Sequence, residues 1–200
     1  MLKQSQTPRL ILVISLIVMA AASRLLPHPP NFTAMGAMAL FGGALIGNRV
    51  LALTLPLVAL LVSDLFLGLD IHTFAGVYIA FVLMAVIGLM MRSRISFLTV
   101  TTGAVVGSVL FFLISNGWDW AANPMYPQTG AGLIAAYAAG LAFYTQEVFG
   151  NFFFNTLMAN VFFSWALFGA YHLVTQNSGE LTPIKIRSNN KQQGSDNAGN

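Results

Sequence analysis

Six long apolar runs, separated by short polar connections, constrain the fold of this chain more than any other feature. They cover residues 10–26, 32–46, 50–69, 73–91, 97–115 and 148–174. A helix of about 20 apolar residues crosses the hydrocarbon core of a bilayer. Only 8% of the residues are charged, far below the roughly 25% of soluble domains. The pattern predicts an all-α, polytopic membrane helical bundle with six transmembrane helices and membrane lipid around it.

The positions of Lys and Arg predict the orientation, because cytoplasmic connections of membrane proteins are enriched in both. With the N-terminus inside, six spans leave Arg24 outside and place the other basic residues inside: Lys3, Arg9, Arg49, Arg92, Arg94, Lys185, Arg187 and Lys191. We therefore predict N-in, C-in. The expected divisions are a cytoplasmic N-terminus (1–9), a six-span domain (10–174) and a disordered cytoplasmic tail (175–200). The expected location is a bacterial inner (plasma) membrane.

Two segments leave alternatives open. Residues 129–144 are rich in Ala and Gly, which fits an interfacial helix, a re-entrant helix or a seventh span. We favour the first two, because a seventh span would separate the termini. The first run, after Lys3 and Arg9, also resembles a signal peptide with a small-residue cleavage site at 20–23. We favour a retained span, because the apolar character continues through Leu26.

Several kinds of chemistry are not indicated. The net charge is +3, but the basic residues are scattered, so no nucleic-acid partner is expected. The chain has no cysteine, which excludes disulfides and thiolate ligands. It contains no HExxH, GxSxG or P-loop pattern, and its His and acidic residues lack a compact metal-ligand spacing. We expect no catalytic residues, no metal and no cofactor, and therefore not an enzyme.

Polar residues collect on the predicted outer side. The proline-rich connection carries His28 and Asn31, Asp64 lies within the third run, and His72 follows at the next turn. A charged residue inside a span is costly and is a functional candidate by default. Each residue also has a structural interpretation. The connection can be a rigid linker with its His in water, and Asp64 can cap a helix or pair with Arg24.

The last run contains a polar ladder. Glu147, Asn151 and Asn155 recur every four residues, so they share one face of a helix. They must face the protein interior or a wet cavity, because lipid would leave them without hydrogen bonds. Hydrogen bonding between helices is the alternative role. Trp118 belongs to an outer aromatic cluster that fits either an interfacial belt or a platform that stacks a ligand ring.

Three sequence motifs resemble those of a family of small, uncharacterised prokaryotic membrane proteins. They are LPHPPNFT at 26–33, GAMALFGGA at 36–44 and SDLFLG at 63–68. That family is similar to the substrate-binding S components of energy-coupling factor transporters. The resemblance implies an S-component-like bundle of six helices, both ends cytoplasmic, with a pocket that opens outward. One departure concerns docking on the coupling partner: S components often use small residues on the first span, whereas here the clearest repeat (Ala39, Gly43, Gly47) is on the second.

We therefore expect a membrane transport protein, a substrate-binding subunit that captures a small vitamin-like solute from the outer side. Uptake would require an energy-coupling module with ATPase subunits as a partner. The alternatives are a non-catalytic membrane scaffold and a membrane enzyme that uses the outer Asp and His residues. The predicted substrate-binding residues are His28, Asn31, Asp64, His72, Trp118, Glu147, Asn151 and Asn155.

Overall fold

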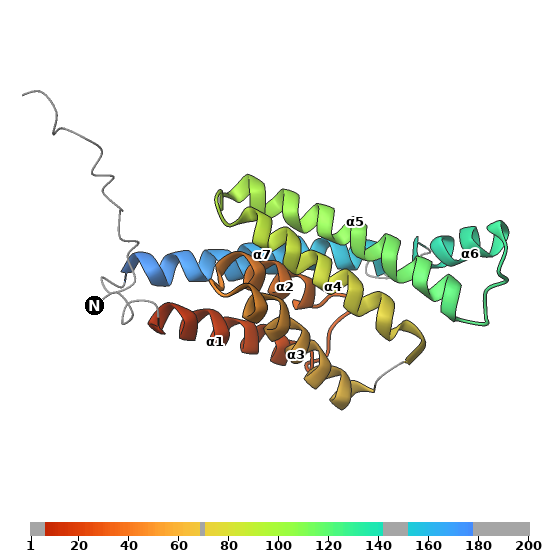
Figure 1. Cartoon of the computed structure of the whole chain (residues 1–200), viewed down its shortest axis with the longest axis horizontal. Coiled ribbons are helices and arrows are strands. Elements are labelled where there is room, and N and C mark those ends of the chain that lie inside the picture. Colours follow the sequence, from red (N-terminus) through yellow and green to blue (C-terminus); the bar gives the residue numbers. More distant parts are fainter. Residues whose placement is uncertain (1–6, 69–70, 142–151, 178–200) are drawn as a thin grey trace, which may run out of the picture.

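The computed structural model describes residues 7–68, 71–141 and 152–177, without the side chains of 71–73 and 177. Residues 1–6 of the predicted N-terminus and residues 178–200 of the predicted tail lie outside this description. The described residues form helices and no strands (Figure 1): α1 (Thr7–Ser23), α2 (Met35–Leu45), α3 (Arg49–Leu67), α4 (Ile71–Met91), α5 (Phe97–Ala122), α6 (Gly130–Leu141) and α7 (Phe152–Asn177).

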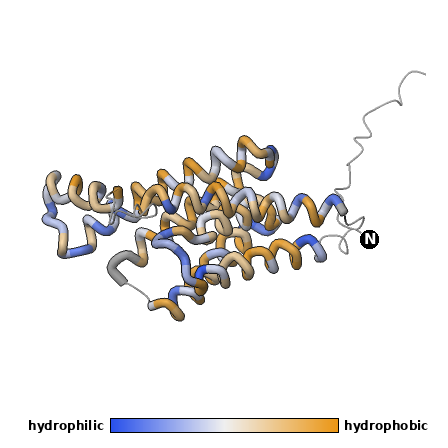
Figure 2. The backbone as a smooth tube through the Cα atoms, turned by 180° about the vertical axis from the view of Figure 1, so that it is seen from behind, coloured by the Kyte–Doolittle hydropathy of each residue, from blue (hydrophilic) through white to orange (hydrophobic). Residues whose placement is uncertain are grey.

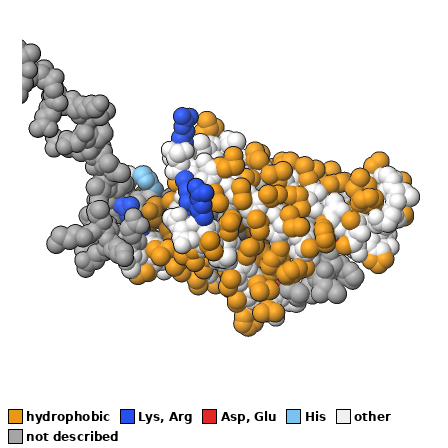
Figure 3. All heavy atoms as spheres, viewed as in Figure 1, with side chains coloured by type: hydrophobic (Ala, Val, Ile, Leu, Met, Phe, Trp, Pro, Cys, Tyr) orange, Lys and Arg blue, Asp and Glu red, His pale blue; other side chains and the backbone are white. Residues whose placement is uncertain are grey.

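The helices form an elongated bundle with two chemically different ends. At one end, α1 begins, α7 ends, and the α2–α3 and α4–α5 connections lie (Figure 1). Four of the five described basic residues belong to this basic end: Arg9, Arg49, Arg92 and Arg94. We call the opposite end, with Arg24 and the α1–α2 loop (residues 24–34), the cavity end. Hydrophilic segments gather at the connections (Figure 2), and hydrophobic side chains cover the flank between the ends (Figure 3).

Four helices are long and apolar enough to cross a membrane: α3, α4, α5 and α7. α1 is apolar but has 17 residues, and α2 and α6 have 11 and 12. The second predicted run, 32–46, therefore yields a helix about 16 Å long, roughly half of the hydrocarbon thickness. α5 instead extends seven residues beyond the predicted end at 115, until Asn123 caps it and Pro124 follows.

The short helix α2 forms the centre of the bundle. It packs against α1, α3, α4, α5 and α7, and all residues from Met35 to Ala44 are buried. A helix that is apolar on every side is stable only where it is covered on every side. The neighbouring helices supply this cover, so α2 can be short without exposing its ends to lipid.

Arg92 stabilises the end of α2 that lies toward the basic end. Its Nε donates to the carbonyl oxygen of Gly43 at 3.0 Å and its Nη1 to that of Gly47 at 3.2 Å, while Nη2 contacts the Ile46 carbonyl. The last carbonyl groups of a helix lack partners within the helix. A cation there satisfies them and interacts favourably with the helix dipole. Arg92 therefore stabilises the buried helix α2, in addition to its position as a basic residue just after the end of α4.

Small residues let α2 approach α4 closely. A Cβ atom on Gly43 would lie 2.1 Å from the carbonyl oxygen of Ala85, and one on Gly88 would lie 2.2 Å from that of Leu40. Both distances are too short for a side chain. The predicted small-residue repeat on the second run is thus used at Gly43, whereas Gly47 faces open space.

Gly88→Ala is expected to lower the free energy of unfolding by about 2 kcal/mol, because overpacking forces two backbones apart. SDS titration of the detergent-solubilised protein measures this value. Gly169→Ala on α7 is the matched control, because nothing lies within 4 Å of a Cβ there. The control should be neutral or slightly stabilising. Equal effects of the two substitutions would contradict the close packing of α2 on α4.

Candidate functional site

A cavity of about 580 Å³ opens at the cavity end of the bundle. Such volumes are typical of sites for small organic molecules. Its lining combines both kinds of side chain needed for such a site. The polar lining residues are Arg24, His28, Asn31, Thr33, Thr156 and Asn160, and the apolar ones include Met35, Leu60, Val77, Phe81, Met84 and Phe111. We call this the main cavity.

The proline-rich α1–α2 loop forms one wall of the main cavity. Its prolines prevent a helix, and Asn31 adopts a left-handed backbone conformation with φ of 60°, which Asn tolerates better than most residues. Asn155 of α7 donates from Nδ2 to the Pro30 carbonyl oxygen at 2.8 Å. The Phe32 ring packs against Phe163 with centroids 5.7 Å apart. The loop is therefore fixed against α7 and holds Asn31 over the cavity.

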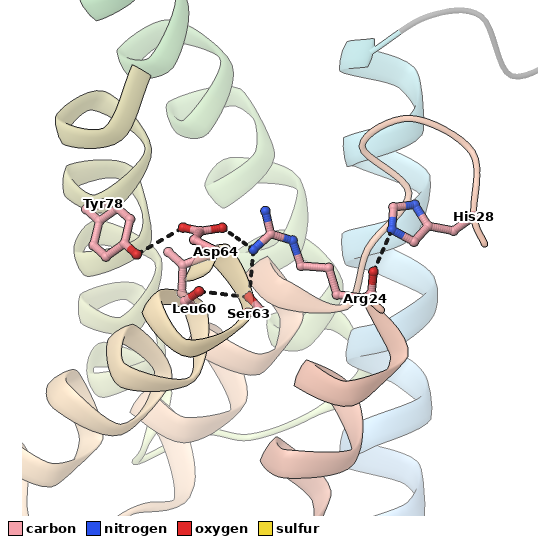
Figure 4. Close-up of polar contacts among 6 residues, drawn as sticks. All are labelled: Arg24, His28, Leu60, Ser63, Asp64 and Tyr78. Atoms are coloured by element: carbon pink, nitrogen blue, oxygen red, sulfur yellow. Dashed lines mark hydrogen bonds and ion pairs between the residues drawn. The ribbon is translucent and has the colours of Figure 1, made fainter. Parts of the chain in front are cut away.

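An ion pair attaches the start of this loop to α3 (Figure 4). Arg24 contacts the Asp64 carboxylate, and its Nη1 also donates to Ser63 Oγ at 2.7 Å. The Tyr78 hydroxyl of α4 donates to the second Asp64 oxygen at 2.9 Å. The Arg24 and Asp64 side chains are 23% and 13% exposed. Because the carboxylate is occupied on both oxygens, Asp64 supports the cavity wall through Arg24, which lines the cavity.

His28 lies in the same loop. Its Nε2 is 3.1 Å from the Arg24 carbonyl oxygen and its Nδ1 is 2.9 Å from that of Pro29. The side chain is exposed and lines the main cavity. The imidazole thus closes the bend between Arg24 and Pro29 (Figure 4 shows the contact with Arg24).

Asn160 of α7 presents an oriented amide at the inner part of the main cavity. The Ser108 hydroxyl donates to the Ala104 carbonyl oxygen at 2.8 Å, so its oxygen is left to accept. Asn160 Nδ2 lies 2.9 Å from that oxygen and is the donor. The amide oxygen, Oδ1, then points toward Gly36, where a Cβ atom would lie 2.3 Å away. Gly36 and Asn160 both line the cavity, so the amide oxygen, held in place by the Ser108 bond, is a candidate hydrogen-bond acceptor.

A second cavity, of about 310 Å³, adjoins the main one. The two share Asn31, Val77, Phe111 and Thr156. The residues that line only the second cavity are Phe112, Ser115, Asn116, Asp119, Gly140, Phe152 and Phe153. The two cavities therefore lie side by side, with these four residues in the walls of both.

The predicted site residues fall into four groups. His28 and Asn31 line the main cavity, and Asp64 bonds to its wall. Asn155 is fully buried and holds the loop without lining either cavity. Trp118 packs over Gly76 of α4 and is 37% exposed. His72 lies in the first turn of α4, but its side chain is outside the description, as are Glu147 and Asn151 altogether.

Four polar lining residues were absent from the predicted set: Arg24, Thr33, Thr156 and Asn160. Asn160 belongs to the polar residues of the last run but breaks the four-residue spacing of the ladder. A stripe at Phe152, Thr156 and Asn160 does keep this spacing, one residue out of phase with the predicted one. Because Phe and Thr are not distinctive in an aromatic-rich helix, the sequence pattern gave no reason to prefer the helix face that carries this stripe.

Together, the fold and composition are those of a polytopic α-helical membrane protein with a solvent-accessible cavity at one end. The chain matches a family of unknown function (DUF6580) over residues 4–182, and it belongs to that family. Comparison with curated proteins and with solved structures gives no significant match. The predicted resemblance to S components has no support from these comparisons and stays a prediction.

Proposed function

We propose that this protein is a solute-binding membrane protein that takes up a small, vitamin-like organic molecule in its main cavity. The observation that carries the proposal is the oriented Asn160 amide beside an apolar floor. Most buried polar groups in proteins are satisfied within the protein. Here the amide nitrogen of Asn160 is bonded to Ser108, and Asn160 lines a cavity of about 580 Å³, so its amide oxygen is available to a molecule there. A small molecule with one N–H or O–H donor and an apolar ring fits this lining.

The orientation and the partner belong to the same proposal. The basic end would face the cytoplasm under the positive-inside rule, so the cavity would open to the outer side of a bacterial inner membrane. Six membrane crossings would follow if α1, together with the α1–α2 loop and α2, completes a pair of spans. These 200 residues contain no P-loop, so active uptake would depend on an S-component-like association with ATPase subunits.

The direct test is purification of the full chain in mild detergent, followed by mass spectrometry of any small molecule released on denaturation. We expect one organic compound in near-stoichiometric amount, which then rebinds to the stripped protein. A stripped protein that binds no released compound and no extract fraction would favour the scaffold alternative.

Asn160→Leu is expected to weaken rebinding of that compound about tenfold, because one hydrogen bond contributes about 1 kcal/mol or more in a dry site. Isothermal titration measures the affinity. Ser164→Ala is the matched control on the same helix. Ser164 is fully buried, and its hydroxyl has no partner among the described residues, so its loss should leave both affinity and folding intact. Unchanged binding by Asn160→Leu would remove the main support for the proposed site.

A further inference from the structure

The second cavity has a lining that suits one chemical group. Asp119 contributes a carboxylate, and four phenylalanines surround the same space: Phe111, Phe112, Phe152 and Phe153. Two of these rings, Phe112 and Phe153, pack with centroids 4.9 Å apart and an interplanar angle of 57°. Aromatic faces combined with one carboxylate are the features by which proteins recognise organic cations.

The charge of Asp119 is not balanced by the described part of the chain. Its Oδ1 accepts a hydrogen bond from Asn123 at 3.0 Å, but the ion pair found among the described residues joins Arg24 and Asp64. Asp119 is partly buried, and a carboxylate that loses part of its water is stabilised by a nearby cation. Asp64, the other acidic residue whose side chain the structure describes, is already neutralised by Arg24.

The lining also argues against other occupants. A metal ion in a protein site is usually held by several His, Cys, Asp or Glu side chains, and no group of three such side chains occurs among the described residues. An anion would be repelled by Asp119, and a neutral apolar group would leave the carboxylate uncompensated. A protonated or quaternary nitrogen carrying apolar substituents satisfies both the carboxylate and the rings.

We propose that the second cavity binds the cationic nitrogen of the solute whose body occupies the main cavity, an inference that rests on the proposed function. The four shared lining residues place the two cavities next to each other, so one molecule can reach both. The substrate class is therefore an organic cation with an apolar or ring-containing body and a hydrogen-bond donor that reaches Asn160. Asp119 gives charge selectivity, and Asn160 gives hydrogen-bond selectivity.

Choline and its uncharged isostere 3,3-dimethylbutan-1-ol are suitable probes, because carbon replaces the quaternary nitrogen without a change of shape. Ligand-observed NMR on the full chain in detergent measures both dissociation constants. We expect choline to bind about tenfold more tightly than the isostere, and Asp119→Asn to remove this difference. Phe153→Leu, which keeps apolar bulk, should weaken choline binding about threefold. Ser164→Ala, which removes a buried hydroxyl on α7 that lines neither cavity, is the control and should leave choline binding within twofold.

Equal binding of the two probes, or full choline selectivity in Asp119→Asn, would overturn the cation site. Should Asp119→Asn fail to fold, Phe153→Leu tests the site in its place, and an unchanged preference for choline would then count against the proposal. The proposed function fails separately, when the stripped protein rebinds no compound. A rebinding compound without a cationic nitrogen would leave that function standing and overturn only the cation site.

Discussion

Replacing either Arg24 or Asp64 alone is expected to lower the free energy of unfolding by about 3 kcal/mol, whereas replacing both costs far less. Arg24→Met leaves the Asp64 carboxylate with only the Tyr78 hydroxyl, and Asp64→Leu leaves the guanidinium beside the Ser63 hydroxyl. An uncompensated charge in a mostly buried position carries a large desolvation cost. In the double variant Arg24→Met/Asp64→Leu no such charge remains, and apolar side chains of similar size fill the space.

SDS titration of the four proteins gives the coupling energy of this pair as a double-mutant cycle. Arg94→Met is the matched control for loss of a basic residue, because Arg94 is exposed in the α4–α5 connection, and it should change stability by less than about 0.5 kcal/mol. If the losses of unfolding free energy simply add in the double variant, the coupling energy between Arg24 and Asp64 is zero. In that case the α1–α2 loop would be held by its contacts with α7 alone.

The apolar runs predicted the helices well because a bilayer imposes one strong condition on composition. The start of α5 at Phe97 agrees with the predicted run, since Ser96 accepts a hydrogen bond from the Thr99 amide and caps the helix. Its end was predicted seven residues early. Hydropathy reports where the apolar core of a span ends, whereas a helix continues through polar residues such as Asn116 and Asp119 until Pro124 follows it.

The lengths of α2 and of the loop before it could not be read from hydropathy. Residues 32–46 are apolar enough to suggest a span, but Phe32 and Thr33 belong to the loop, and the helix begins at Met35. A tertiary contact holds the loop before α2 in place: the Pro30 carbonyl accepts a hydrogen bond from Asn155, 125 residues away. Sequence patterning describes a helix by its own residues, so it missed that other helices cover this one entirely.

The sequence predicted the loop that lines the candidate site, but it did not predict which face of α7 meets the cavity. The proline-rich loop pointed to His28 and Asn31, and both line the main cavity. On α7, a spacing of four residues defines a face, but apolar residues surround the helix, so nothing local tells which face meets the cavity. Asn155 therefore holds the loop, while Thr156 and Asn160 line the space. The pairing of Asp64 with Arg24 was one of two structural interpretations left open beside a substrate-binding role, and the ion pair is present in the structure.

Thr156→Phe is expected to weaken binding of the co-purified solute at least 100-fold while leaving the protein folded, a loss of about 2.8 kcal/mol in binding free energy. Thr156 lines both cavities, so an aromatic ring there occupies their junction. The added ring enters empty space. For this reason stability should hold or rise, which separates a blocked site from a damaged fold.

Met158→Phe is the matched control, because it places the same ring on the same helix at a side chain that is 38% exposed. Positions 156 and 158 lie about 200° apart around a helix, so the control ring points away from the cavities. Titration of both variants with the solute, beside their SDS unfolding curves, gives the two quantities needed. A folded Thr156→Phe protein that binds as tightly as the parent would mean that the solute does not occupy this cavity, and neither the Asn160 acceptor nor the Asp119 site could then contribute to its recognition.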